Sequence, residues 1–268
     1  MKVPAGACDT HMHFYEANAP VPPGTFMPGV FTVEDYRAAV QKRLGLERVV
    51  VVQANAYRDD NSVVLNAIAK LGAAAKGVAV VRASVAEGEL ERLTKGGICG
   101  VRIMTLHGGT LGFDAMDELM ARVHPFGWHA NIQLDGRELP KYRERLSKLP
   151  VDLVIDHNGK FLEPVAVDHP AFRVLLELLD GGRAWVKLAA PYETSKVGPP
   201  GYDDVSALAR ALVQRNPQRC LWASNWPHPN RNPAPANAAM LDLLLDWAGN
   251  EATARRILAD NPARLYFS

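Results

Sequence analysis

The chain has 268 residues, of which 48% are hydrophobic and 22% are charged, a composition that supports one large hydrophobic core. Its 30 Lys and Arg residues nearly balance 29 Asp and Glu residues, so the formal net charge is +1. This balance, without a long run of either sign, argues against nucleic acid or an anionic membrane as a partner. We therefore expect a small-molecule ligand, and the composition leaves the oligomeric state open.

No apolar segment approaches the ~20 residues that a membrane span requires, and the first six residues do not resemble a secretory signal. The three cysteines, Cys8, Cys99 and Cys220, contain no C-x-x-C pair and fall within or just before apolar runs. This pattern indicates buried free thiols in a reducing compartment. We predict a cytoplasmic protein.

The first strand-like stretch, residues 8–14, carries two histidines two residues apart. In a strand, His11 and His13 project from the same face of the backbone. Such a pair can bind a metal, donate hydrogen bonds to a developing oxyanion or transfer a proton. The alternative is that both are satisfied polar groups of the core or a loop.

Strands and helices then alternate along the chain. Residues 15–31 are rich in proline and glycine, which predicts a loop. A helix follows, which Thr32 and Asp35 cap and which ends at Gly45. The remaining strands are predicted at 48–53, 77–82, 100–104, 129–134, 151–156, 184–188 and 220–223, and the remaining helices at 62–71, 87–95, 115–123, 140–148, 171–179, 203–214 and 236–247.

Eight strands that are each followed by a helix, without a linker to mark a second domain, predict a single α/β domain over residues 1–268, a (β/α)8 barrel. In this fold the active site lies at the C-terminal ends of the strands. Lys187 is either a cation of that site or part of an ion pair inside the barrel. We interpret Gly108–Gly112 as a mobile lid. The residues expected at the strand ends are His11, His13, Asn55, Tyr57, Arg82, Arg102, Gln133, His157, Lys187 and Asn225.

Six motifs carry a family resemblance: Asp9-Thr-His-Met-His13, Gly100-Val-Arg102, Gly127-Trp-His129, Asp156-His-Asn-Gly-Lys160, Leu221–Pro229 and Asn261–Tyr266. In this order they resemble the amidohydrolase superfamily over nearly the whole chain. More narrowly, they resemble its branch of 2-pyrone-4,6-dicarboxylate lactonase and galactarolactone isomerase, and residues 161–164 and 190–195 are more similar to the isomerase. The resemblance implies a reacting centre formed by His11, His13, His157 and Asn225.

The eighth strand departs from the family pattern. Most amidohydrolases carry an aspartate there as metal ligand and base, whereas this chain has Asn225. A neutral carboxamide is a poor metal ligand beside imidazoles and cannot take a proton from water. We therefore predict no metal and no other cofactor. The asparagine either suits a tight turn between Ser224 and Trp226 or is an introduced, inactivating change.

The candidate binding residues suggest a substrate with one anionic group. Arg102 presents a guanidinium fork suited to a carboxylate, although it can also form a salt bridge in the barrel mouth. The resemblance implies two further arginines in the dicarboxylate lactonase, where this chain has Gly108 and Glu193. Hydroxyls of a sugar acid would find acceptors and neutral donors on Asn55, Tyr57, Gln133 and Glu193. Tyr192 and His228 complete the predicted binding residues, and the alternative for His228 is that it only orients its Trp-Pro-His-Pro turn.

Our leading hypothesis is a metal-independent isomerase that converts the 1,5-lactone of a sugar acid, similar to galactarolactone, into its 1,4-lactone. The histidines, at least one of them cationic, would stabilise the oxyanion. An internal hydroxyl held close would outcompete water that no aspartate activates. The alternative is a lactone or ester hydrolase with a histidine base or with a metal on the three histidines. A catalytically silent sugar-acid binding protein is disfavoured because all three histidines are present.

Overall fold

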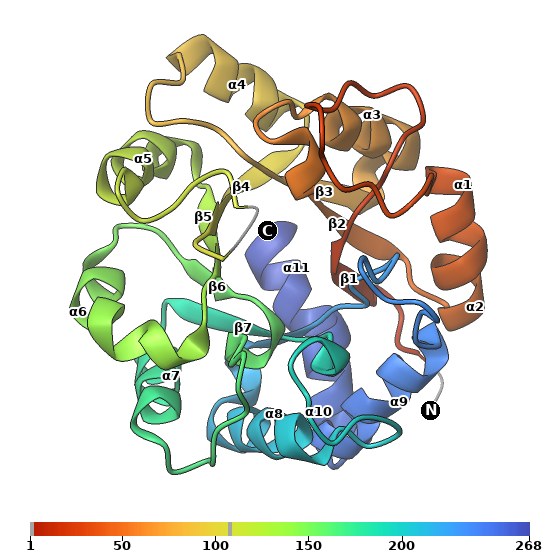
Figure 1. Ribbon diagram of the computed structural model, residues 1–268, viewed down its shortest axis with the longest axis vertical. Helices are drawn as coiled ribbons and strands as arrows, with labels where there is room; N and C mark the ends of the chain where they lie inside the picture. Colours follow the sequence, from red (N-terminus) through yellow and green to blue (C-terminus); the bar gives the residue numbers. More distant parts are fainter. Residues whose placement is uncertain (1–2, 107–108) are drawn as a thin grey trace.

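The computed structural model describes residues 3–106 and 109–268, and its strands form one parallel sheet (Figure 1). Next to the last strand, the backbone N–H of Asn225 donates to the carbonyl of His11 at 2.9 Å, so the sheet closes into the predicted barrel. The described strands, in their order around the sheet, are β1 (Cys8–Met12), β2 (Arg48–Val52), β3 (Ala75–Ala79), β4 (Ile98–Met104), β5 (His129–Gln133), β6 (Leu153–Ile155), β7 (Ala184–Leu188) and β8 (Cys220–Trp222).

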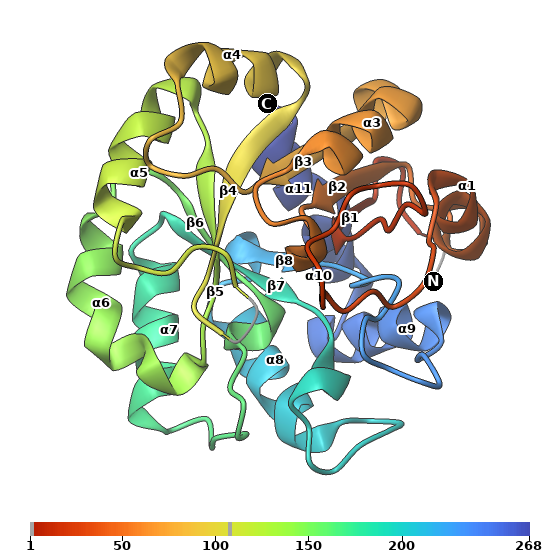
Figure 2. The same ribbon diagram turned by 45° about the horizontal axis from the view of Figure 1, so that its top comes forward.

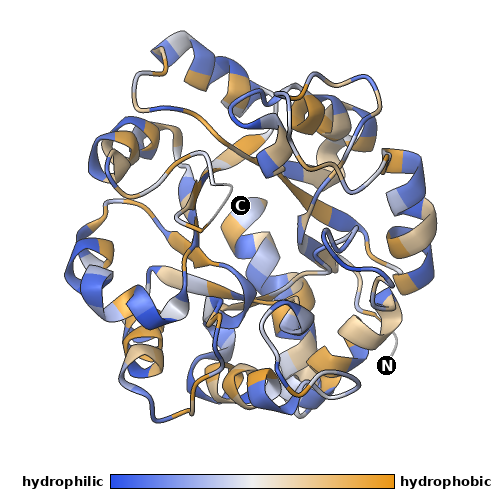
Figure 3. Ribbon diagram, viewed as in Figure 1, coloured by the Kyte–Doolittle hydropathy of each residue, from blue (hydrophilic) through white to orange (hydrophobic). Residues whose placement is uncertain are grey.

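Helices surround these strands on all sides (Figures 1 and 2). Figure 3 shows helices of mixed hydropathy, as expected for amphipathic helices that pack one face on a barrel. The described α-helices are α1 (Val33–Tyr36), α2 (Lys42–Leu44), α3 (Ser62–Leu71), α4 (Glu87–Lys95), α5 (Met116–Val123), α6 (Leu139–Lys148), α7 (Pro170–Asp180), α8 (Asp203–Arg215), α9 (Asn237–Ala248), α10 (Glu251–Arg255) and α11 (Asn261–Tyr266).

The first helical segment shows both the predicted cap and an unpredicted irregularity. Thr32 and Asp35 form a reciprocal capping box at the start of α1, and Gly45 ends α2 with a φ of 75°. Between α1 and α2, a π-helical turn at Arg37–Gln41 interrupts the regular helix. The predicted bounds therefore hold, while the single regular helix that we expected is divided.

The C-terminal helices are an addition that the sequence prediction lacks. Figure 1 shows α11 across the centre of the ring of strands. Its Tyr266 is buried in one cluster with side chains of the strands, among them Val50, Val154 and Leu221. The ring of Tyr266 also lies 5.3 Å from that of His129 in β5. The end of the chain thus covers the N-terminal face of the barrel, opposite the C-terminal ends of the strands, where this fold places its site.

Two sequence predictions need correction. The third strand ends at Ala79 rather than at Arg82, so Arg82 lies in the following loop, where its side chain is 58% exposed and pairs with Asp59 at 2.6 Å. The three cysteines are free thiols as predicted, but Cys99 is only partly buried. Among the described residues, no helix is both long enough and apolar enough to cross a membrane.

Candidate active site

A cavity of about 980 Å³ opens at the C-terminal ends of the strands. The predicted lid is represented there by Gly109 and Thr110, whereas Gly108 lies outside the described residues. Eight of the predicted residues contribute to the cavity wall: His13, Asn55, Arg82, Arg102, Gln133, His157, Glu193 and Asn225.

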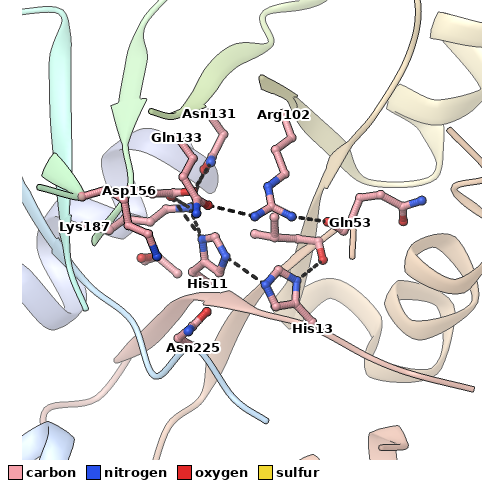
Figure 4. A network of polar contacts seen from close by, with 12 residues as sticks. His11, His13, Gln53, Arg102, Asn131, Gln133, Asp156, Lys187 and Asn225 are labelled. Atoms are coloured by element: carbon pink, nitrogen blue, oxygen red, sulfur yellow. Dashed lines mark hydrogen bonds and ion pairs between the residues drawn. The ribbon is translucent and has the colours of Figure 1, made fainter. Parts of the chain in front are cut away.

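The two histidines of β1 hydrogen-bond to each other (Figure 4). His13 Nδ1 lies 2.8 Å from the carbonyl of Val52, to which it can only donate. Its Nε2 is therefore unprotonated and accepts the Nε2–H of His11 at 3.1 Å. His11 Nδ1 then accepts a hydrogen bond from Lys187 at 3.0 Å. His11 Nδ1 also lies 3.2 Å from Asp156 Oδ1, so the roles of the His11 nitrogens follow from its neutral form, whereas those of His13 are fixed by the Val52 carbonyl.

A buried ion pair lies against the ring of His11. Lys187 Nζ lies 3.2 Å from Asp156 Oδ1, both side chains are fully buried, and neither lines the cavity. Asn131 donates to Asp156 Oδ2 at 2.9 Å and accepts a hydrogen bond from Lys187. Burial raises the pKa of Asp156, but Lys187, His11 and His157 together lower it by more, so the pKa lies well below its usual value. Lys187 is therefore an interior partner and not a cation of the cavity.

Burial lowers the pKa of His11 and His157 well below the usual value, and that of His13 to about 3. This contradicts the expectation that one of the histidines is cationic, because burial outweighs the nearby Asp156 carboxylate, which by itself raises the pKa of His11 and His157. Instead, the site contains three neutral imidazoles. His157 lines the cavity, and its Nδ1 is buried without a hydrogen-bond partner among the described residues.

A cluster of imidazoles and a carboxylate can hold a divalent metal, so we tested whether these residues fit one. Ligand atoms of His11, Asp156 and His157 lie within 4.8 Å of one another. However, the ammonium of Lys187 already neutralises the Asp156 carboxylate and bonds to His11. The eighth strand adds only the neutral amide of Asn225. The arrangement does not suit a divalent cation, which prefers charged ligands and is repelled by an ammonium group.

A chain of hydrogen bonds sets the orientation of the Asn225 amide. The His228 ring donates from Nε2 to Asn237 Oδ1 at 2.8 Å, and burial lowers its pKa to about 4. Its Nδ1 therefore accepts the hydroxyl proton of Tyr192 at 2.8 Å. The Tyr192 oxygen in turn accepts one amide N–H of Asn225 at 2.9 Å, and Glu193 Oε1 accepts the other at 3.0 Å. Only the Oδ1 of Asn225 remains for a ligand.

The backbone at Asn225 also has the geometry expected of a tight turn, with a φ of 57°. This left-handed conformation is one that asparagine tolerates better than most residues. In Figure 4, the oxygen of the amide is turned towards the side of His11 and His13.

Arg102 is held by three protein acceptors. Its Nη1 donates to the carbonyl of Gln53 at 2.8 Å and to Asn55 Oδ1 at 3.1 Å, and its Nη2 donates to Gln133 Oε1 at 3.0 Å. Its buried Nε has no partner among the described residues. Since a guanidinium carries five N–H donors, Nε–H and one Nη2–H remain for a ligand. Asn55 and Gln133 thus use their oxygens to orient Arg102, which leaves one lone pair on each oxygen for a substrate hydroxyl.

Three predicted binding residues lie behind the cavity wall. The hydroxyl of Tyr57 accepts the backbone N–H of Glu16 at 2.9 Å. Tyr192 and His228 form the hydrogen-bond chain behind Asn225, and none of the three lines the cavity. A different tyrosine, Tyr15, contributes to the wall instead. Its position inside the proline-rich loop gave no signal in the sequence.

Lys160 is a cavity residue that sequence analysis missed. It follows a single helical turn at His157–Gly159 and has a left-handed φ of 50°. Its side chain is only 9% exposed, and its Nζ contacts Glu193 Oε2. Burial lowers the pKa of Lys160 to about 7, while the Glu193 carboxylate in contact with it favours the charged ammonium. The only available signal was its place in the Asp156–Lys160 motif.

The fold and the residues at the strand ends define a barrel of the amidohydrolase type, and the amidohydrolase family model matches residues 8–267. The chain belongs to this family, as the sequence motifs predicted. It is 38% identical to D-galactarolactone isomerase of Agrobacterium fabrum, over 98% of this chain and 91% of that protein. It is also 32% identical to 2-pyrone-4,6-dicarbaxylate hydrolase of Comamonas testosteroni, over 99% of this chain and 92% of that protein.

A solved structure from Agrobacterium tumefaciens, in its apo form, superimposes with a TM-score of 0.93 at 36% sequence identity. The match covers 99% of this chain and 97% of that structure. The barrel described here therefore has the architecture of its relatives along nearly its whole length.

Proposed function

We propose that this protein is a metal-independent isomerase that converts the 1,5-lactone of a sugar acid, such as D-galactarolactone, into the 1,4-lactone. The observation that carries the proposal is the fixed amide of Asn225, where a water-activating aspartate would otherwise stand. Both of its N–H groups are bonded to protein, so it presents an acceptor oxygen but no base. Such an oxygen can hold a substrate hydroxyl in place, which favours intramolecular attack over hydrolysis.

The other cavity residues suit the remaining parts of such a substrate. Two N–H groups of Arg102 are available for its single carboxylate. His157 is neutral, and one of its nitrogens carries a proton that no described residue accepts. This N–H would stabilise the oxyanion that forms when a hydroxyl attacks the ring carbonyl. His11 and His13 hydrogen-bond to each other beside this position.

The buried ion pair between Asp156 and Lys187 supports metal independence. The only metal-type cluster among the described residues contains Asp156, whose charge Lys187 neutralises. A lactone hydrolase is the second candidate, because three relatives that are 31% to 33% identical to this chain are named as hydrolases. In that case water would replace the substrate hydroxyl as nucleophile, with a histidine as base.

The test is to follow D-galactaro-1,5-lactone by NMR with purified protein, with and without a chelator, and to measure the metal content. We expect the 1,4-lactone to form faster than in an enzyme-free control, at a rate that chelation leaves unchanged. Exclusive formation of the open-chain acid would support the hydrolase. Stoichiometric zinc together with loss of activity on chelation would overturn metal independence, and binding without turnover would indicate a silent binding protein.

A further inference from the structure

Lactone isomerisation needs two proton transfers, and His11 and His13 are poor candidates for them. The attacking hydroxyl must lose a proton and the departing ring oxygen must gain one. His13 has both nitrogens committed, to Val52 and to His11, and burial lowers its pKa to about 3. His11 does not line the cavity, and its ring contacts Lys187, Asp156 and His13. The amide of Asn225 neither takes up nor releases a proton near neutral pH.

The cavity contains one carboxylate and one ammonium in direct contact with each other. Glu193, on the short turn Pro191–Glu193 after β7, and Lys160, after β6, both line the wall. Their side chains are 17% and 9% exposed. The amide of Asn225 donates to Glu193 Oε1, whereas Lys160 Nζ contacts Glu193 Oε2. The pair is therefore hydrogen-bonded to Asn225, the residue that we expect to hold the substrate hydroxyl.

On the basis of the proposed function, we infer that Glu193 and Lys160 are the acid–base couple of the isomerisation. The Glu193 carboxylate takes the proton of the substrate's 4-hydroxyl while the oxygen of that hydroxyl, O4, forms a bond to C1. The tetrahedral oxyanion collapses, the bond between C1 and O5 breaks, and Lys160 gives a proton to O5. The proton on Glu193 then passes to the neutral Lys160 amine across their contact. This transfer restores both groups, so the cycle consumes no proton and no water.

The charges around Lys160 are compatible with this exchange. Besides Glu193, the groups that face it are Asp156 from the end of β6, Arg102 from β4 and Arg231 from the loop after β8. Burial lowers the pKa of Lys160 most and the two arginines lower it further, whereas Asp156 raises it. The ammonium is therefore a stronger acid than that of an ordinary lysine, and its contact with Glu193 offers a direct path for the returning proton.

The experiment compares Glu193→Gln, Lys160→Met and the double variant in the NMR assay, after correction for the enzyme-free reaction. General acid–base catalysis contributes roughly 100-fold or more, so each single variant should lower kcat by about that factor and change KM by less than about 3-fold. The double variant should be no slower than the slower single variant, because the two residues act as a unit.

A pH profile separates proton transfer from a structural role. Glu193→Gln should remove the acidic limb of the kcat profile, and Lys160→Met the alkaline limb. If Lys160→Met fails to fold, Lys160→Arg keeps the cation but cannot release its proton. It should therefore retain the melting temperature and lose kcat.

The chain also offers a matched control. Lys196 and Glu163 join the same two loops at 3.1 Å, but their side chains are 58% and 60% exposed. The variant Glu163→Gln with Lys196→Met should keep kcat and both limbs. If the wild-type protein is active and each single variant keeps kcat within about 3-fold of it, this inference is overturned while the proposed function stands. Absence of rearrangement by the wild-type protein would instead overturn the proposed function.

Discussion

At the scale of single residues, the chemistry turns on whether position 225 carries an amide or a carboxylate. The sequence identified Asn225 as the departure from the family pattern, because its motif and its place after the eighth strand can be read directly. It did not show that both amide N–H groups are bonded. That orientation depends on Tyr192, His228 and Asn237, whose contacts arise only in the fold.

We predict that Asn225→Asp raises lactone hydrolysis relative to isomerisation. The nearly isosteric carboxylate would supply a base for water, an effect that we expect to be roughly 10- to 100-fold. The measurement is the ratio of open-chain acid to 1,4-lactone by NMR, with chelator present because a new carboxylate could recruit a metal. An unchanged ratio over the whole pH range would show that the missing aspartate is not why water is excluded.

A second residue-scale prediction concerns Arg102. Replacement by alanine removes a buried cation from the carboxylate of the substrate and should cost about 2 to 5 kcal/mol of transition-state stabilisation. Arg102→Lys should recover only part, because lysine lacks the planar fork. The check is kcat/KM for an acidic lactone and its neutral analogue. Equal turnover of the two by the wild-type protein would argue against this role.

At the scale of elements, the sequence predicted the strands well and the turns after them poorly. Buried parallel strands appear as apolar runs, so β7 was predicted at its observed bounds, Ala184–Leu188. The turn at His157–Gly159 has no such periodicity, and it is this turn that brings Lys160 into the cavity. Tyr57 was misplaced for the same reason, since the loop conformation turns its hydroxyl towards the backbone of Glu16.

Helix α11 was missed because it follows α10 without an intervening strand, and it leads to a stability prediction. The hydroxyl of Tyr266 is buried without a partner among the described residues. Such burial costs about 1 to 3 kcal/mol, so Tyr266→Phe should raise the free energy of unfolding. Tyr36→Phe in α1 is the control and should lower it, because that hydroxyl donates to the buried Asp9 at 3.0 Å. Denaturant unfolding measures both changes. If the two variants changed the free energy of unfolding in the same direction, the argument would be refuted.

At the scale of the whole molecule, the barrel keeps several imidazoles out of water at both of its ends. Burial lowers the pKa of His13 and His129 to about 3 and that of His228 to about 4. In the unfolded chain these groups titrate near pH 6.5. Below that pH the unfolded state binds protons that the folded state does not, so stability that is fully present above pH 6.5 is lost as the pH falls towards 3.

We therefore predict that the free energy of unfolding decreases by about 1.4 kcal/mol per pH unit for each such histidine between pH 6 and pH 4. His129→Gln tests this without touching the cavity, since His129 lies against Tyr266 at the opposite end of the barrel. Denaturant unfolding at several pH values should show a shallower slope for this variant. His124→Gln, at an exposed position, should keep the wild-type slope. A histidine that is neutral in the folded state must contribute to the pH dependence of stability. If both variants gave the wild-type slope, His129 would not be such a histidine, and the acid sensitivity would have to come from the carboxylates.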